Sequence, residues 1–200
     1  KDDKGIWQIS QLPEVESAFV AVDPKDGAIR ALVGGFDFNR NKFNHVTQAW
    51  RQPGSSFKPF IYSASLEKGY GPGSVIADEP IVIPASQTGA QAWEPHNYDG
   101  KYEGPIRMRT ALAKSKNMVS IRLLQSIGTH YAQDYAGRFG FDPAKHPPYL
   151  TMALGAGSVT PWQMVTGYAV FANGGYKINP FVVREIRDER TGRPIAYEKK

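Results

Sequence analysis

Ser55 and Lys58 are the first residues whose types and spacing could do chemistry. Three residues apart on a helix, a hydroxyl and an amine are neighbours and could share a proton. A serine hydroxyl is a weak nucleophile at neutral pH, so it needs a base, and a lysine serves when burial or nearby positive charge lowers its pKa. A helix that begins at the serine would also favour a developing anion there. The pair therefore predicts a serine nucleophile with a lysine base.

A simpler interpretation makes Ser55 the N-cap of a helix and Lys58 a solvated surface charge. A chain of this composition should hold roughly one Ser-x-x-Lys match by chance. A second match, Ser65 with Lys68, is indeed present, in the last turn of the expected helix, where a lysine is favoured for C-terminal capping. We interpret the second match as chance, and spacing alone leaves both interpretations of Ser55 open.

Ser115 and Asn117 form a second candidate pair, about 60 residues further on, between two expected helices. In a turn there, the serine could pass a proton between a lysine and a leaving group. The carboxamide of Asn117 could hold a substrate amide, because it both donates and accepts hydrogen bonds. The alternative is that Asn117 only caps the helix that starts at Met118.

Strands at both ends and helices between them are the elements that must position these residues. Apolar residues at 57, 60, 61 and 64 have helical spacing and predict a helix over 56–68 with one buried face. A capping box at Thr160 and Gln163, with proline between them, starts another helix that ends near Asn173. The remaining expectations are a hairpin over 18–22 and 29–33, an irregular loop over 70–105, helices over 106–113, 118–127 and 130–139, and strands over 181–186 and 195–197. Strands, then helices, then strands indicate an α+β fold with an antiparallel sheet packed against helices.

Composition excludes several classes of function. The 200 residues are 41% hydrophobic and 12% aromatic, which indicates an ordered domain with a core. The net charge of +5 is scattered rather than clustered, so we expect no nucleic-acid partner. Without cysteines, and with its four histidines far apart, the chain predicts no metal and no cofactor. No apolar run approaches the roughly 20 residues needed to span a bilayer.

Three longer segments carry a family resemblance: RQPGSSFKPFIYSASLEKG, WEPHNYDGKYEGPIRMRTALAKSKNMVSIRLL and ALGAGSVTPWQMVTGYAVFANGG. A Ser-x-x-Lys tetrad followed by Ser-x-Asn is the ordered motif set of penicillin-binding proteins and class A β-lactamases. The segments resemble the transpeptidase domain of bifunctional class A penicillin-binding proteins, of the 1A type. The resemblance extends from about Glu16 to Ile195.

The resemblance implies a serine D,D-transpeptidase that cross-links peptidoglycan stem peptides and is a target of β-lactams, with roles in cell shape and antibiotic resistance. On this mapping Ser55 is acylated, Lys58 is the base, Ser115 relays a proton and Asn117 binds the substrate amide. Trp93, Asn97 and Tyr98 match a family stretch that lines the cleft or packs behind it. A membrane anchor, a glycosyltransferase and a place on the periplasmic face of the inner membrane are implied for the parent protein.

The third motif of the family, Lys-Thr/Ser-Gly, is not in the chain. Arg190-Thr191-Gly192 suits a hairpin tip better than a cleft-facing strand, because charged residues surround it and Pro194 follows. We therefore expect residues 1–200 to be the N-terminal and central portion of one transpeptidase domain whose C-terminal part lies outside this chain. We also expect these 200 residues alone to be inert, which labelling with a fluorescent penicillin tests.

Three other functions stay open at this stage. A D,D-carboxypeptidase or a serine β-lactamase would hydrolyse the same acyl-enzyme, although no carboxylate is assigned to activate a deacylating water. A sensor would bind β-lactams or cell-wall peptides without turnover. A purely structural role is the remaining alternative.

Overall fold

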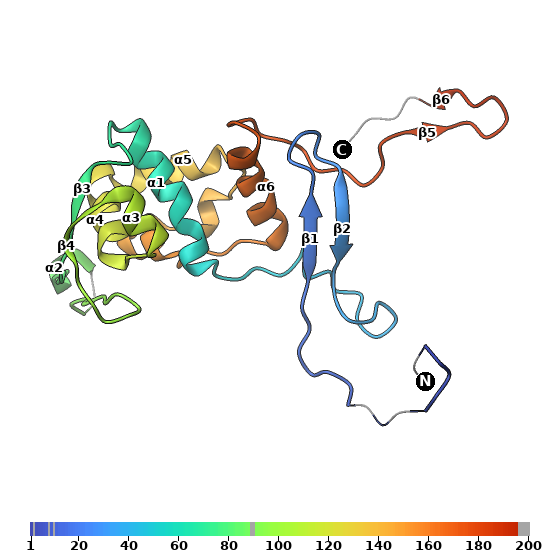
Figure 1. The fold of residues 1–200 in the computed structure, drawn as a ribbon, viewed down its shortest axis with the longest axis horizontal. Coiled ribbons are helices and arrows are strands. Elements are labelled where there is room, and N and C mark those ends of the chain that lie inside the picture. The colour runs from blue at the N-terminus through green and yellow to red at the C-terminus, as the bar shows by residue number, and fades with distance from the viewer. Residues whose placement is uncertain (2, 8, 10, 89–90, 196–200) are drawn as a thin grey trace.

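The helices form a block on one side of a β-hairpin, and α6 lies between the rest of that block and the hairpin (Figure 1). The structure is a computed structural model that describes residues 1–200 except 2, 8, 10, 89–90 and 196–200. The strands are β1 Phe19–Val22, β2 Ile29–Val33, β3 Val75–Asp78, β4 Gly104–Arg107, β5 Ile186–Arg187 and β6 Pro194–Ile195. The α-helices are α1 Lys58–Glu67, α2 Ala85–Thr88, α3 Met108–Ala113, α4 Asn117–Ile127, α5 Thr129–Gly137 and α6 Pro161–Ala172, and the 3-10 helices are η1 Gly54–Phe57, η2 Pro143–Lys145 and η3 Leu150–Leu154. Antiparallel strand pairs with helices confirm the predicted α+β class.

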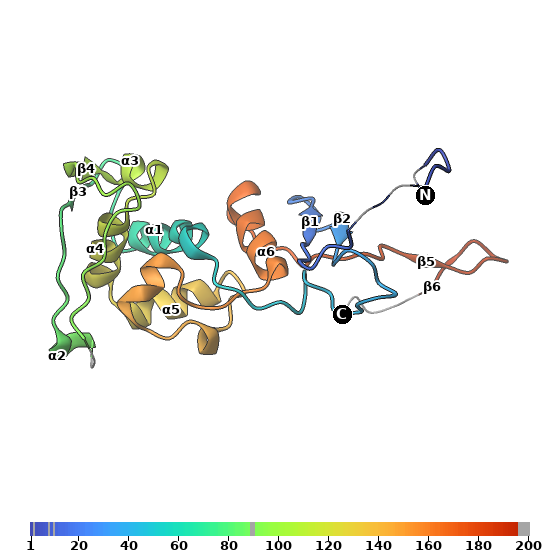
Figure 2. The same ribbon diagram turned by 90° about the horizontal axis from the view of Figure 1, so that it is seen from below.

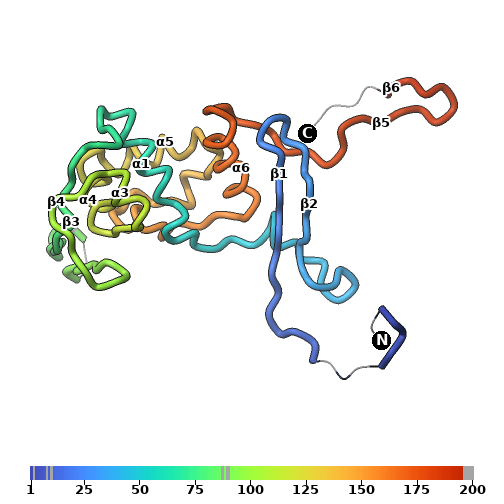
Figure 3. Tube along the Cα trace, in the orientation of Figure 1, coloured from blue at the N-terminus to red at the C-terminus, as the bar shows by residue number. Residues whose placement is uncertain are grey.

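The predicted hairpin is present as β1 and β2, with Phe19 opposite Val33. Gly27, in the turn between them, has a φ of +83° and approaches Asn179 so closely that a Cβ there would lie 2.7 Å from the Asn179 carbonyl oxygen. The predicted strand over 181–186 is wrong for most of its length, because Phe181 forms an isolated bridge with Ala28 and the strand β5 begins only at Ile186. Figure 3 shows β5 and β6 projecting beyond the hairpin, away from the helices.

Helix α1 lies at the centre of the helical block and contacts α4, α5 and η3. The four apolar residues whose spacing predicted it are at most 1% exposed: Phe57, Phe60, Ile61 and Ala64. Fully burying a side chain such as Phe60 contributes about 1.5–3 kcal/mol, so this face holds the block together. The predicted start of the helix is wrong, however. The 3-10 helix η1 precedes α1, so Ser55 lies inside a 3-10 turn and is not an N-cap.

The predicted irregular loop over 70–105 contains a strand pair and a short helix. Strand β3 pairs with β4 from Val75 opposite Arg107 to Asp78 opposite Gly104. The expected helix over 106–113 is therefore too long, since Ile106 and Arg107 belong to β4. Glycine and proline at 104 and 105 concealed a strand of four residues. Figure 2 shows β3, β4 and α3 together at one end of α4.

Helix α6 begins as its capping box predicts. The Thr160 hydroxyl accepts from the Gln163 N–H at 3.2 Å, and the Gln163 side chain accepts from the Thr160 N–H at 3.2 Å. Its N-terminal neighbour Val159 exchanges two backbone hydrogen bonds with Arg51. The start of α6 is thereby tied to the segment that leads into Ser55.

Candidate active site

The backbone before Ser55 is fixed by the segment 155–159. The Gly54 N–H donates to the Gly155 carbonyl at 3.3 Å, and the Gln52 side chain donates to the Ala156 carbonyl at 3.2 Å. Gly155 has a φ of +72°, and a Cβ there would lie 2.1 Å from the Gly54 carbonyl oxygen. Only a glycine allows this approach. On the other side of Ser55, the Tyr168 hydroxyl donates to the Ser56 carbonyl at 2.8 Å.

Phe57 anchors the same turn in the core. Its ring is fully buried and lies 4.7 Å from the ring of His146, nearly parallel to it, and 5.2 Å from the ring of Phe141. Ser55, two residues earlier, is exposed. The turn therefore exposes the Ser55 hydroxyl while the packing of Phe57 holds its backbone in place, and a nucleophile requires such a fixed position.

Lys58 begins α1 and is only 1% exposed. Its Nζ lies 2.6 Å from the Ser115 carbonyl oxygen, 2.7 Å from Asn117 Oδ1 and 3.1 Å from Ser115 Oγ. Burial lowers the pKa of Lys58 to about 8, which raises its neutral fraction at pH 7 by two to three orders of magnitude, to about a tenth. A neutral amine has two N–H groups, enough for the two nearer oxygens, and one lone pair, which can then accept a hydroxyl proton.

The turn between α3 and α4 presents Ser115 and Asn117 to Lys58. Ser115 has a φ of +55°, the left-handed conformation that non-glycine residues rarely adopt. Helix α4 begins at Asn117 with Lys116 as its N-cap, so the interpretation of Asn117 as a cap for Met118 is wrong. The Asn117 carboxamide instead accepts from Lys58 and donates to the His96 carbonyl at 2.8 Å. The turn therefore brings together the two sequence motifs, which lie about 60 residues apart.

Lys116 points the other way, into a cluster of carboxylates that sequence reasoning missed. Its Nζ lies 3.0 Å from Asp99, 3.3 Å from Glu103 and 3.5 Å from Asp78, and both Lys116 and Asp78 are at most 1% exposed. Burial opposes the charge of Lys116, but hydrogen bonds to Asp99 and Glu103 outweigh it and raise its pKa. The sequence did hold one signal for this: if Ser115 and Asn117 face the candidate site, the residue between them must point to the opposite side, toward the protein interior.

Of the three predicted residues in the segment 93–98, two line the same cavity as Ser55 and one does not. Tyr98 is fully exposed and Asn97 is 4% exposed, and both line a cavity of about 270 Å³ together with Ser55, Ser115 and Asn117. Trp93 does not line that cavity. It exchanges two backbone hydrogen bonds with Ile83 and lines a separate cavity with Leu150 and Tyr149. The 270 Å³ cavity, with a hydroxyl, a lysine-bound amide and a second hydroxyl on its walls, is the candidate active site.

The other sequence matches lie elsewhere. The Ser65 hydroxyl donates to the Ile61 carbonyl at 2.9 Å and is fully buried, whereas Lys68 Nζ lies 4.1 Å from the centre of the Tyr131 ring. Thr191 lies in the turn between β5 and β6, where Asp188 accepts from its N–H and its hydroxyl. These contacts confirm the predicted hairpin tip at 190–192.

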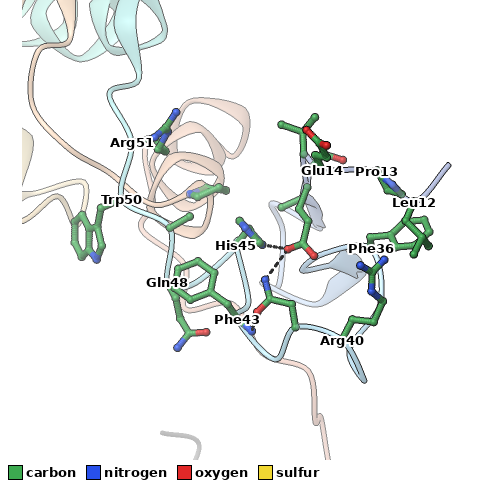
Figure 4. A pocket seen from close by; sticks show the side chains of 17 residues that line it. Leu12, Pro13, Glu14, Phe36, Arg40, Phe43, His45, Gln48, Trp50 and Arg51 are labelled. Carbon is green, nitrogen blue, oxygen red and sulfur yellow. Dashed lines mark hydrogen bonds and ion pairs between the residues drawn. The ribbon is translucent and has the colours of Figure 1, made fainter.

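A larger cavity, of about 1190 Å³, lies between the segment 12–18 and the segment 36–51 (Figure 4). In it Glu16 accepts from the Asn41 side chain at 2.9 Å and lies 3.5 Å from the His45 ring nitrogen. Among the described residues that line it there is no lysine, in contrast to the walls of the 270 Å³ cavity. Among the described residues, no cluster of histidines and carboxylates could hold a metal ion, and no helix is long and apolar enough to cross a membrane.

The chain belongs to the family of penicillin-binding protein transpeptidase domains, since residues 17–200 match it. It is 50% identical over 188 residues to penicillin-binding protein 1A of Neisseria lactamica, and 46% identical over 198 residues to that of Pseudomonas aeruginosa. These alignments cover 94% and 99% of this chain but 24% of each relative. The chain thus spans about a quarter of the length of the curated relatives it matches, and the predicted resemblance to the 1A type is confirmed.

Solved structures give the same result. Penicillin-binding protein 1A of Haemophilus influenzae aligns with a TM-score of 0.88 at 42% identity, over 98% of this chain and 29% of that chain. The PonA1 protein of Mycobacterium tuberculosis in complex with penicillin V aligns with a TM-score of 0.77 at 26% identity, over 92% of this chain and 51% of that chain. The α+β fold is therefore that of a penicillin-binding transpeptidase domain.

Proposed function

We propose that residues 1–200 are the N-terminal and central portion of one D,D-transpeptidase domain, in which Ser55 forms an acyl-enzyme with a peptidoglycan stem peptide. The observation that carries the proposal is the position of Lys58 Nζ, within 3.1 Å of Ser115 and Asn117, beside the cavity that Ser55 lines. A buried amine with a pKa of about 8 is a competent base near neutral pH.

In the acylation step, Ser55 Oγ attacks the carbonyl carbon of the terminal D-Ala-D-Ala bond and its proton passes to neutral Lys58. The backbone N–H of Ser55 is one donor to the oxyanion. The proton then travels by way of Ser115 Oγ, 3.1 Å from Lys58 Nζ, to the departing amine, and D-alanine leaves. An amine on a neighbouring stem peptide attacks the ester, and the reverse proton transfers regenerate Ser55 and release the cross-linked product.

Asn117 and Tyr98 are proposed to hold the substrate. The carboxamide of Asn117 keeps one lone pair and one N–H beyond its bonds to Lys58 and His96, which suits a peptide amide. Tyr98 is fully exposed at the wall of the cavity, where its ring can cover a bound peptide. Trp93 lies outside this wall, so any contact it makes would be with a more distant part of the substrate.

A β-lactam should acylate Ser55 in the same way, because its strained amide replaces the scissile bond. The complex of the related PonA1 protein with penicillin V supports this proposal. The relatives are named penicillin-binding protein 1A. From the resemblance to bifunctional class A proteins we further propose a parent protein that is anchored in the inner membrane, faces the periplasm, acts in peptidoglycan synthesis and carries a glycosyltransferase. No cofactor is needed for either half of the transpeptidation.

The test is mass spectrometry of the full-length protein after treatment with benzylpenicillin. We expect one adduct, on Ser55, and none in Ser55→Ala. Ser65→Ala, which removes the hydroxyl of the chance match, is the matched control and should label normally. An adduct on any other residue would refute the assignment. An adduct that survives for hours supports transpeptidation, whereas loss within minutes would indicate a β-lactamase.

A further inference from the structure

The first turn of α4 is capped from outside the helix. Its own N-cap, Lys116, has no side-chain acceptor for the free N–H groups. The acceptor is Asn97 Oδ1, from the segment before β4, which lies 2.8 Å from the Asn117 N–H and 3.3 Å from the Met118 N–H. The residue that binds Lys58 is thus held at its backbone by Asn97.

The orientation of the Asn97 carboxamide is fixed by Asp78. Asn97 Nδ2 donates to Asp78 Oδ1 at 2.7 Å and to the Lys101 carbonyl at 2.8 Å. A flipped carboxamide would set its Nδ2 against two N–H donors and its Oδ1 against a carboxylate oxygen. Four hydrogen bonds therefore use both polar atoms of a side chain that is only 4% exposed, which leaves little for a substrate.

Asp78 is held in turn by two donors on its other oxygen. Asp78 Oδ2 accepts from the Glu103 N–H at 3.0 Å and lies 3.5 Å from Lys116 Nζ. Lys116 lies between Ser115 and Asn117 in the sequence. The turn is therefore held at Lys116 by the salt bridge to Asp78 and at the start of α4 by the hydrogen bonds to Asn97. Buried polar groups with complete hydrogen bonding rigidify what they join.

We propose that Asn97, oriented by Asp78, is a positioning residue that fixes Asn117 and Ser115 around Lys58. The proposal rests on the acyl-transfer function proposed above and assigns Asn97 to the support of the site, not to contact with the reacting atoms. A loss of position of about 1 Å in a catalytic group costs roughly 100-fold in rate.

The test is an exchange of the two side chains in the full-length protein. Asn97→Asp places two carboxylates face to face. Asp78→Asn sets its new Nδ2 against Asn97 Nδ2 or, if the carboxamide flips, against the Glu103 N–H and Lys116 Nζ. In the double variant, D78N with N97D, the new asparagine donates to the new aspartate, whose other oxygen still caps α4. The measurement is the second-order rate constant for acylation of Ser55 by a fluorescent penicillin, per folded molecule, with the folded fraction from circular dichroism.

We expect each single variant to acylate about 100-fold more slowly than the wild type. The exchange should recover at least a factor of about ten, and not all of the loss, because the Lys101 carbonyl then faces an oxygen. Ser65→Ala is the matched control. It removes another fully buried hydrogen bond and should change stability without changing the rate per folded molecule.

Single variants that fold and acylate at the wild-type rate would refute the positioning role while leaving Ser55 as the labelled residue. Asn97→Ala replaces Asn97→Asp if the latter does not fold, since it removes the cap without a charge. If no single variant folds, the exchange variant must fold and acylate, and its failure would refute the role. An adduct away from Ser55 in the wild type would overturn the proposed function, and the positioning role with it.

Discussion

Gly155 is the residue whose replacement should most directly displace Ser55. An alanine Cβ at 155 would lie 2.1 Å from the Gly54 carbonyl oxygen and 2.7 Å from the Gly54 nitrogen, whereas real Cβ contacts stay above 3.0 Å. The distance from this Cβ to the Gly54 oxygen must therefore grow from 2.1 Å to at least 3.0 Å, which moves the two segments apart by about 0.9 Å. Because Gly54 precedes Ser55 directly, the hydroxyl should move by a similar distance, and a displacement of about 1 Å costs roughly 100-fold in rate.

The assay compares Gly155→Ala with Gly69→Ala in the full-length protein, by acylation rate with a fluorescent penicillin and by thermal unfolding. Gly69 has a φ of +94° with nothing within 4 Å of its Cβ position, so Gly69→Ala pays only the backbone cost of about 1–2 kcal/mol. We expect both variants to lose stability and only Gly155→Ala to lose about 100-fold in rate. Equal acylation rates in the two variants would show that the Gly54–Gly155 contact does not position Ser55.

Two further predictions concern Lys58 and Thr160. Because burial lowers the pKa of Lys58 to about 8, the unfolded chain binds more protons than the folded chain between about pH 8 and about pH 10.4. The free energy of unfolding should therefore rise with pH across that window relative to Lys58→Met, and the acylation rate of the wild type should rise with a midpoint near 8. If the difference in free energy of unfolding between the wild type and Lys58→Met did not change with pH, the burial of an ionisable amine would be contradicted. Thr160→Ala removes one half of a capping box and should lower the free energy of unfolding by about 1 kcal/mol, measured by denaturant titration, whereas an unchanged midpoint would contradict the cap.

The sequence predicted the elements whose signal is periodic and local. The buried face of α1 follows from Phe57, Phe60 and Ile61, and the start of α6 follows from Thr160 and Gln163, because neither depends on distant contacts. Strand β4 was missed because glycine and proline occupy two of its four residues, and β3, Val75–Asp78, was missed because four residues are too few to show a clear alternation. Ser55 was misplaced at an N-cap because its turn is set by Gly155, a hundred residues away.

The candidate site also contains residues that the sequence predicted and residues that it did not. Ser55, Lys58, Ser115 and Asn117 come from short motifs, and the structure brings them to one cavity or to its wall. The carboxylates around Lys116 come from β3, which holds Asp78, and from the segment 97–103, which holds Asp99 and Glu103, and no motif spacing along the chain predicts their meeting. They meet only because Lys116 is buried where β3 and the segment 97–103 come together at the start of α4.

The left-handed backbone at Ser115 limits how this position can change over time. Among the described residues outside glycine, Ser115 alone has a positive φ, and relaxing it would gain about 1–2 kcal/mol. Glycine is the replacement that gains most, yet it lacks the hydroxyl that lies 3.1 Å from Lys58 Nζ. A change that stabilises the backbone at this residue therefore removes the hydroxyl that the proposed proton relay requires, so stability and the proposed function make opposite demands on position 115.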